Sequence, residues 1–364
     1  MNVTATTTLS PLLQTAATAT DIWNDSCAVD ELEYAIAHGA VGATANPTIV
    51  HEVWKKDPGR WARRVRQLAD AMPGATETHL AWAIVEEMSG EGAALLLPAF
   101  EKYGGRQGRL SMQTNPTFWR SYEPMLGQGV HFTEVAPNII VKFPATMTGI
   151  AVIEEATYRG VSINATVSFS VAQAVAAAEA VERGLERREA EGLRTDDMGP
   201  VITIMVGRIE DWLRVLVDRD GIVVHPSALA YSGVAVFKRA YGIFKERGFR
   251  ARLLAAAIRH HLHWSEFVGG DVVITLPSSW QKKFNASNVR VRERMDDPVD
   301  PDYIKELSSA FPDFVKAYEP DGLTLDEFDT YPPTVRTLRA FIASYHDLLA
   351  AVTDAQLPNP DIRS

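Results

Sequence analysis

Short apolar runs of the kind that form strands alternate along this chain with longer segments whose apolar residues recur at helical spacing. The runs are apolar almost throughout, which is typical of strands buried on both faces of a parallel sheet. Most of the segments between them are long enough to hold a crossover helix. We predict eight strands, within residues 21–27, 41–46, 109–114, 138–146, 161–169, 201–207, 251–257 and 271–277.

Eight strand–helix units in one chain favour a closed barrel, so we predict an α/β fold with a single (β/α)8 TIM barrel over residues 21–364. The alternative is an open doubly wound sheet, which usually carries a Gly-rich phosphate loop after its first strand. GGRQG at 104–108 precedes a strand instead and is typical of a turn. The clearest predicted helix spans 171–192, which contains no proline.

The two ends of the chain differ in character from the repeating units. We assign residues 1–20 to an N-terminal extension. Residues 282–335 are charged and proline-rich, which predicts an irregular excursion with short helices. That excursion could cover a barrel mouth or form a solvated surface loop. Residues 332–354 predict an amphipathic closing helix that packs back on the barrel.

Composition narrows the class of protein. The chain has 364 residues, of which 46% are hydrophobic, enough for one large core. A net charge of −10 argues against sequence-independent nucleic-acid binding, so anionic ligands must be met by particular arginines or helix N-termini. No apolar stretch is long enough for a membrane span, and no signal peptide is recognisable, so we expect a cytoplasmic protein. The single cysteine, Cys27, excludes an intrachain disulfide and is expected in the core.

Polar residues interrupt the apolar runs near the C-terminal ends of the predicted strands, where the catalytic side chains of such barrels lie. Every predicted strand except the last contributes, and one arginine falls just past the seventh run. The residues are Asp25, Thr44, Asn46, Gln113, Lys142, Asn164, Thr166, Thr203, Arg208 and Arg259.

Lys142 is the most informative of these residues, because it lies between apolar residues and should project into the barrel. Burial of an unpaired ammonium costs several kcal/mol, so the barrel should lower the lysine pKa. A neutral amine can attack a ketone to give a protonated imine, which permits cleavage of the neighbouring carbon–carbon bond. The structural alternatives are a lysine that extends to the rim or pairs with Asp25.

Asp25 is the candidate acid/base group, since aldol cleavage requires a group that accepts the hydroxyl proton. Its alternatives are a structural ion pair or a helix cap. The neutral hydrogen-bonding residues at the strand ends suit sugar hydroxyls and water, although a satisfied core polar group is their usual role. Arg208 and Arg259 could bind a phosphate in a forked geometry, although either alone is more often a surface residue.

At these same residues the sequence resembles the transaldolase family. The stretches are IWNDS, GATANPTIV, RLSMQT, NIIVKFPAT, GIAVIEE, SINATVSFSVAQA and VGRIEDW, in the family's order from Asp21 to about Pro277. The resemblance implies a (β/α)8 barrel in which Lys142 forms the Schiff base and Asp25 is the acid/base. It assigns substrate contacts to Thr44, Asn46, Asn164, Thr166 and Thr203, and the sugar phosphate to Arg208 and Arg259. It also implies no metal or organic cofactor, and a role in the pentose phosphate pathway.

Three positions depart from the family pattern. Gln113 stands where the family has a catalytic glutamate, as it does in the related fructose-6-phosphate aldolases, and glutamine can only orient a water. Met205 replaces an aromatic residue near the three-carbon unit. Ala257 replaces a serine two positions before Arg259, which removes one expected phosphate hydrogen bond.

We therefore carry three hypotheses for function. The first is transfer of a dihydroxyacetone unit between sugar phosphates through a Schiff base on Lys142. The second keeps the imine but releases the three-carbon unit, as an aldolase does. The third is a non-catalytic protein that binds a sugar phosphate. A homodimer is compatible with each of them. No two of His260, His261 and His263 are four apart in a helix, and no cysteine or acidic ligand frames a metal site, so a metal site is not expected.

Overall fold

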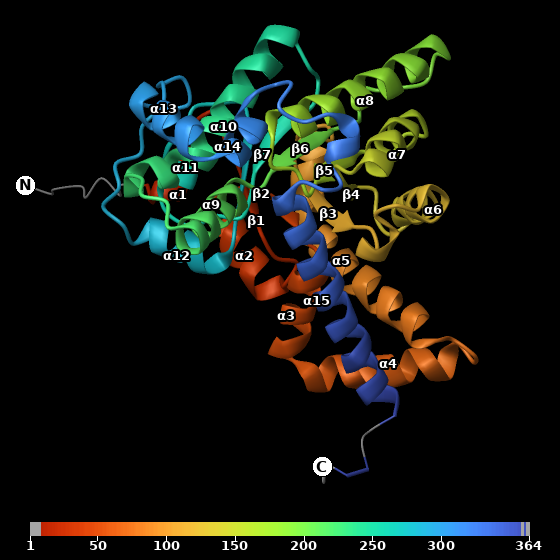
Figure 1. The fold of residues 1–364 in the computed structure, drawn as a ribbon. Coiled ribbons are helices and arrows are strands. Elements are labelled where there is room, and N and C mark those ends of the chain that lie inside the picture. Colours follow the sequence, from red (N-terminus) through yellow and green to blue (C-terminus); the bar gives the residue numbers. More distant parts are fainter. Residues whose placement is uncertain (1–8, 358–359, 362–364) are drawn as a thin grey trace, which may run out of the picture.

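The computed structural model describes residues 9–357, 360 and 361, and its strands form one closed parallel barrel (Figure 1). The strands follow the chain order around the barrel, and β1 closes it by pairing with β8. The predicted fold is confirmed, and each strand lies within its predicted range except β2, which begins one residue earlier, at Ala40. The strands are β1 (Asp21–Asn24), β2 (Ala40–Thr44), β3 (Arg109–Gln113), β4 (Ile139–Pro144), β5 (Ile163–Thr166), β6 (Val201–Ile204), β7 (Arg252–Ala255) and β8 (Val273–Leu276).

Helices surround the barrel and occupy the segments between the strands (Figure 1). Among the described helices, none combines the length and apolar character that a membrane span requires. The helices are α1 (Pro11–Ala16), α2 (Val29–Ala37), α3 (Pro47–Lys56), α4 (Pro58–Ala71), α5 (Glu77–Lys102), η1 (Pro116–Phe118), α6 (Tyr122–Phe132), α7 (Met147–Tyr158), α8 (Val171–Ala190), α9 (Val206–Asp220), α10 (Pro226–Arg247), α11 (Leu262–Ser265), α12 (Ser278–Asn285), α13 (Pro301–Ala310), α14 (Pro312–Tyr318), η2 (Leu325–Glu327) and α15 (Pro332–Gln356).

Trp23 of β1 lies two positions before Asp25 and, because side chains alternate along a strand, faces the barrel interior. The indole of Trp23 is fully buried, and a Cβ on Gly42 would lie 2.5 Å from its ring, so β2 requires a glycine there. Cys27 is also buried, as expected for a core residue. Because side chains alternate along a strand, the polar residues further along β2, β3, β4 and β5 reach the same interior at the opposite end of the barrel.

The N-terminal segment is attached to the barrel through α1. Leu12 is fully buried, and the Trp264 indole Nε1 donates a hydrogen bond to Thr15 Oγ1 at 3.0 Å. The domain boundary at residue 20 stays a prediction, and residues 1–8 lie outside the described residues.

The C-terminal region divides into an outer part and a crossing helix. Helices α13 and α14 pack against α10, on the outside of the barrel. Helix α15 contacts α9 and continues past α3, α4 and α5 (Figure 1). At its start, Gln173 Nε2 donates to Thr334 Oγ1 at 3.3 Å, and both side chains are buried. The predicted excursion, residues 282–335, therefore packs mainly against α10 on the outside of the barrel. The closing helix α15 instead crosses the end of the barrel that carries the polar residues.

Candidate active site

Lys142 lies inside the barrel, near the end of β4. Its side chain is only 5% exposed, and within the described part of the chain no carboxylate lies within 4.0 Å and no atom accepts a hydrogen bond from Nζ. Burial lowers the pKa of Lys142 to about 8, and the negative charge of Asp25 partly opposes that effect. Lys142 therefore neither extends to the rim nor forms an ion pair. This amine therefore loses its proton more readily than an ordinary lysine does, and its uncharged form can act as a nucleophile.

Asp25 follows β1, and its carboxylate is oriented by neighbouring hydroxyl groups. Thr44 Oγ1 donates to Asp25 Oδ1 at 2.6 Å, and Thr275 Oγ1 lies 3.0 Å from Thr44 Oγ1. Neither a cation nor a helix N-terminus in the described ranges binds this carboxylate, so neither structural alternative for Asp25 applies. The expectation that the last strand contributes no polar residue was wrong, because the hydroxyl of Thr275 on β8 extends the hydrogen-bond network from Thr44 to Asp25.

A second chain of hydrogen bonds fixes Asn164 beside Lys142. The two residues are register partners across β4 and β5. Thr203 Oγ1 donates to Asn164 Oδ1 at 2.7 Å, and Asn164 Nδ2 donates to Ser111 Oγ at 3.0 Å. The hydroxyl of Thr166, two positions further along β5, bonds to no described residue and is available to a ligand. Ser111 was missed from the sequence, although it lies two positions before Gln113 and so faces the same way.

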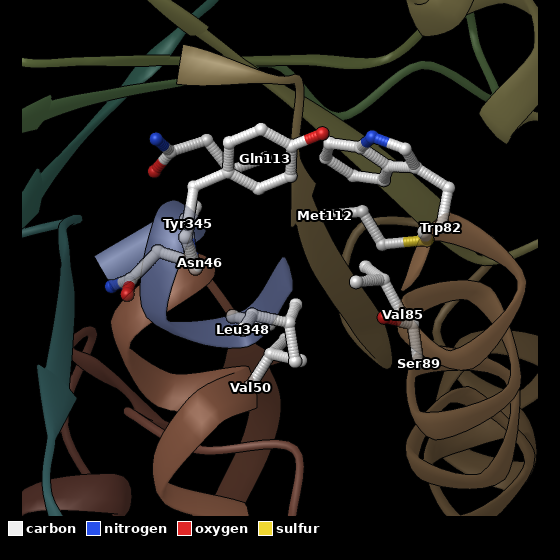
Figure 2. A pocket seen from close by; sticks show the side chains of 11 residues that line it. Asn46, Val50, Trp82, Val85, Ser89, Met112, Gln113, Tyr345 and Leu348 are labelled. Atoms are coloured by element: carbon white, nitrogen blue, oxygen red, sulfur yellow. The ribbon is translucent and has the colours of Figure 1, made fainter. Parts of the chain in front are cut away.

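Gln113 is the register partner of Lys142 on β3. Its Oε1 is buried and has no hydrogen-bond partner among the described residues, so this oxygen can accept from a water or a hydroxyl. Figure 2 shows that Gln113 and Asn46 line a small, mainly apolar pocket closed by Trp82 of α5 and Tyr345 of α15. Asn46 also caps α3, since its Oδ1 accepts from Ile49 N at 3.0 Å.

Arg208 lies in the first turn of α9 and carries an unused donor. Its Nε is buried and has no partner in the portion of the chain described. Burial, followed by the positive charge of Arg259, lowers its pKa, and the charge of Arg336 on α15 acts in the same direction. Phe341 lies under the guanidinium, 5.8 Å from its centre to the ring centroid. The arrangement places positive charge at a helix N-terminus, which favours anion binding. Arg336 was not predicted from the sequence.

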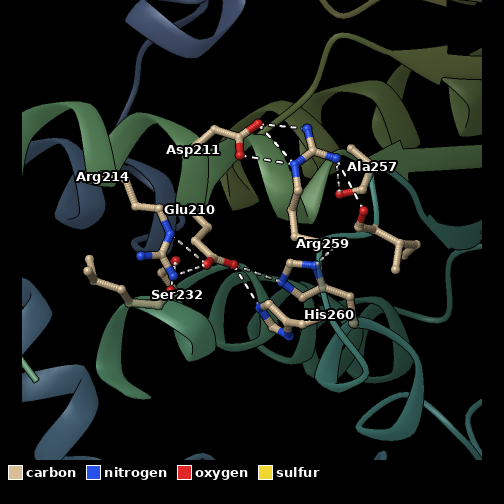
Figure 3. A network of polar contacts seen from close by, with 10 residues as sticks. Glu210, Asp211, Arg214, Ser232, Ala257, Arg259 and His260 are labelled. Carbon is tan, nitrogen blue, oxygen red and sulfur yellow. Dashed lines mark hydrogen bonds and ion pairs between the residues drawn. The ribbon is translucent and has the colours of Figure 1, made fainter. Parts of the chain in front are cut away.

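Arg259 lies opposite Arg208, on the loop after β7, and is held by Asp211 of α9 (Figure 3). Its Nη2 donates to Asp211 Oδ2 at 2.7 Å, and its Nη1 donates to the carbonyl of Ala257 at 3.2 Å. Ala257 has a φ of +63°, which costs an L-residue roughly 1 kcal/mol. A Cβ on Gly207 would lie 1.9 Å from that carbonyl, so glycine permits the loop to approach α9.

Comparisons with known proteins show which family this chain belongs to. The model of the transaldolase/fructose-6-phosphate aldolase family matches residues 22–350. The chain belongs to this family. It is 24% identical to "Transaldolase 2" of Streptomyces avermitilis over 345 residues, covering 87% of each chain. It is 28% identical to "Transaldolase" of Thiobacillus denitrificans over 225 residues, covering 60% of this chain and 61% of that protein.

The family's barrel carries an additional cluster in this chain, next to the arginines. Glu210 of α9 approaches His260 and His263, and their ligand atoms all lie within 4.8 Å of one another. The expectation that no acidic ligand frames a metal site at these histidines was wrong. Glu210 lies 50 positions from His260 and meets it only through the packing of α9 on the loop after β7.

Met205 completes the description of the family site in this chain. It is the N-cap of α9, it is 7% exposed, and its backbone N donates to the carbonyl of Ser168 at 3.0 Å. An unbranched thioether at this position gives the wall beside Arg208 a flexible, apolar surface.

Proposed function

We propose that this protein is a transaldolase-type transferase, in which Lys142 forms a Schiff base with a ketose phosphate and a dihydroxyacetone unit passes to an aldose acceptor. The observation that carries the proposal is the buried, unpaired amine of Lys142 inside the barrel, with its lowered pKa and the oriented carboxylate of Asp25 nearby. A cationic amine could not attack a carbonyl, and an exposed one would stay protonated near pH 7.

The chemistry follows from the positions of the residues. Lys142 Nζ attacks the ketose carbonyl carbon, and loss of water gives a protonated imine. Asp25 accepts the proton of the hydroxyl on the carbon beyond the bond that breaks, and an aldehyde leaves. The electron pair of that bond forms an enamine on Lys142. The enamine then attacks the acceptor aldehyde, Asp25 returns its proton, and water releases the new ketose. Gln113, Asn164 and Thr166 hold the imine and the water.

The sugar phosphate is held at the start of α9 in this proposal. Arg208 offers its unpaired Nε. Arg259 offers the N–H of Nη2 that does not bond to Asp211. Arg336 adds a third positive charge. Thr44 and Asn46 lie on the Asp25 side, where they face the sugar hydroxyls, while Thr203 acts by orienting Asn164.

An aldolase is the second candidate, and Gln113 favours it. A glutamine orients water but cannot carry its proton, so transfer of protons during imine hydrolysis depends on other groups. Fructose-6-phosphate aldolases share the family model with transaldolases. In that case the three-carbon unit is released as dihydroxyacetone.

Borohydride trapping tests the proposal. Incubation with fructose 6-phosphate and borohydride should leave a six-carbon or three-carbon adduct on Lys142, and the three-carbon mass shows that the bond was cleaved. Lys142→Met should abolish the adduct, whereas Lys55→Met at an exposed lysine should not. Adduct yield should rise with pH through about 8. Steady release of dihydroxyacetone without an acceptor indicates the aldolase, and absence of any adduct contradicts both enzymes in favour of a non-catalytic sugar-phosphate binder.

A further inference from the structure

The loop that carries Arg259 is fastened to α9 by one buried carboxylate, that of Glu210 (Figure 3). Arg214 donates to Oε1 from Nε at 2.9 Å and from Nη2 at 2.5 Å. On the other oxygen, His260 Nε2 lies 2.8 Å from Oε2, and His263 Nε2 lies 3.6 Å from it. His263 Nε2 is thus beyond hydrogen-bond distance of this oxygen. Glu210 is 2% exposed, so the donors of Arg214 and His260 replace its hydration.

The direction of the hydrogen bonds at His263 decides what this cluster does. The backbone N–H of Arg259 donates to His263 Nδ1 at 3.2 Å, so Nδ1 must be the unprotonated nitrogen. In neutral His263 the proton is therefore on Nε2, which faces Glu210. A metal ion at Nε2 would require the proton on Nδ1, where it would meet the Arg259 N–H. The cluster is thus arranged as a hydrogen-bonded anchor, although its residue types could also bind a metal.

The anchor determines where Arg259 stands. His260, the residue directly after Arg259, bonds to the Glu210 carboxylate through Nε2, and the next residue along α9, Asp211, accepts hydrogen bonds from the Arg259 guanidinium. The strained φ of Ala257 must be imposed by surrounding contacts, because the loop would otherwise relax. Two adjacent carboxylates on α9 therefore fix the loop at His260 and the side chain of Arg259.

We propose that Glu210 is a positioning residue of the phosphate subsite, acting through His260 on the neighbouring Arg259. The inference rests on the proposed function, since it takes Arg259 to bind the sugar phosphate. It assigns Glu210 no contact with substrate. It predicts that losing the carboxylate weakens binding of the phosphate group and leaves the chemistry at Lys142 unchanged.

Glu210→Gln is the test, because an amide keeps the shape but turns an N–H group toward the donors of Arg214 or the histidines. We expect KM for fructose 6-phosphate to rise about tenfold, the effect of roughly one charge-assisted hydrogen bond, with kcat nearly unchanged. Adduct formation with dihydroxyacetone, which has no phosphate, should be unaffected. Glu266→Gln is the matched control, since Glu266 is also buried but binds Lys238 and Arg294 instead.

A double variant separates positioning from a general structural effect. In an Arg259→Ala background, Glu210→Gln should add little to KM, and an undiminished tenfold effect there would overturn the inference. So would an equal loss with dihydroxyacetone, or elemental analysis that finds a stoichiometric metal ion in the purified protein that Glu210→Gln removes. If the wild type handles phosphorylated and unphosphorylated donors equally well, the proposed phosphate subsite fails instead, whatever Glu210 does.

Discussion

The amine of Lys142 and the carboxylate of Asp25 occupy very different surroundings inside one barrel. Lys142 is almost wholly buried without a partner, whereas Asp25 is half-buried and accepts a hydrogen bond from Thr44. Burial penalises the charged form of the amine and so makes Lys142 easier to deprotonate. The result is an activated amine beside an oriented carboxylate, which is the combination that imine formation and aldol cleavage require.

Lys142→Met should raise the midpoint of thermal unfolding below pH 8. The pKa of Lys142 is about 8 in the folded chain and ordinarily 10.5, so the unfolded chain binds the proton more tightly. The resulting cost to folding is roughly 1–3 kcal/mol, since a tenfold change in proton affinity is worth about 1.4 kcal/mol. It is fully present below the folded-state pKa and disappears as pH rises toward 10.5. Calorimetry from pH 6.5 to 10 should show that the difference in unfolding midpoint between Lys142→Met and the wild type shrinks as pH rises. A difference that stays constant over this range would contradict the prediction.

The strands were predictable element by element, because burial on both faces leaves an apolar run that stands out from its surroundings. The polar residues that interrupt these apolar runs near the strand ends included Lys142 and Gln113, and this identified them as candidate site residues. Helix packing was not predictable in this way. Glu210 looks like one more charged residue on an amphipathic helix, and nothing local shows that α9 packs this carboxylate against the loop after β7. Arg336 was likewise indistinguishable from a solvated residue of the closing helix.

A pair of glycines tests how closely the β7 loop must approach α9. Gly207→Ala should destabilise the fold by about 1–3 kcal/mol and raise KM for fructose 6-phosphate, because its Cβ would lie 1.9 Å from the Ala257 carbonyl and 2.7 Å from Arg259 Cγ. Gly242→Ala, inside α10 with no atom within 4 Å of the new methyl, should stabilise by about 0.5–1 kcal/mol. Urea unfolding measures both effects. Equal changes in the free energy of unfolding for Gly207→Ala and Gly242→Ala would show that the loop after β7 can move away from α9 without cost.

At the scale of the whole molecule, an acidic chain builds one local positive site from segments far apart in sequence. The net charge is −10, yet the charges of Arg259 and Arg336 both lower the pKa of Arg208 at the start of α9. The third arginine comes from α15, which reaches this place only because it crosses from α9 to α4. The closing helix therefore does more than cover apolar surface. It adds the charge of Arg336 to those of Arg208, which follows β6, and Arg259, which follows β7.

Arg336→Ala should weaken binding of phosphorylated sugars, and Arg339→Ala should not. Both residues are exposed and lie one turn apart on α15, but only Arg336 acts on Arg208. Removing one partly exposed charge should raise KM for fructose 6-phosphate about three- to tenfold, equivalent to roughly 0.7–1.4 kcal/mol, without changing kcat. The effect should shrink in 0.5 M salt, because the interaction crosses solvent. Steady-state kinetics at two ionic strengths provide the measurement. Equal effects of the two alanine variants would mean that α15 contributes only its overall charge and no specific phosphate contact.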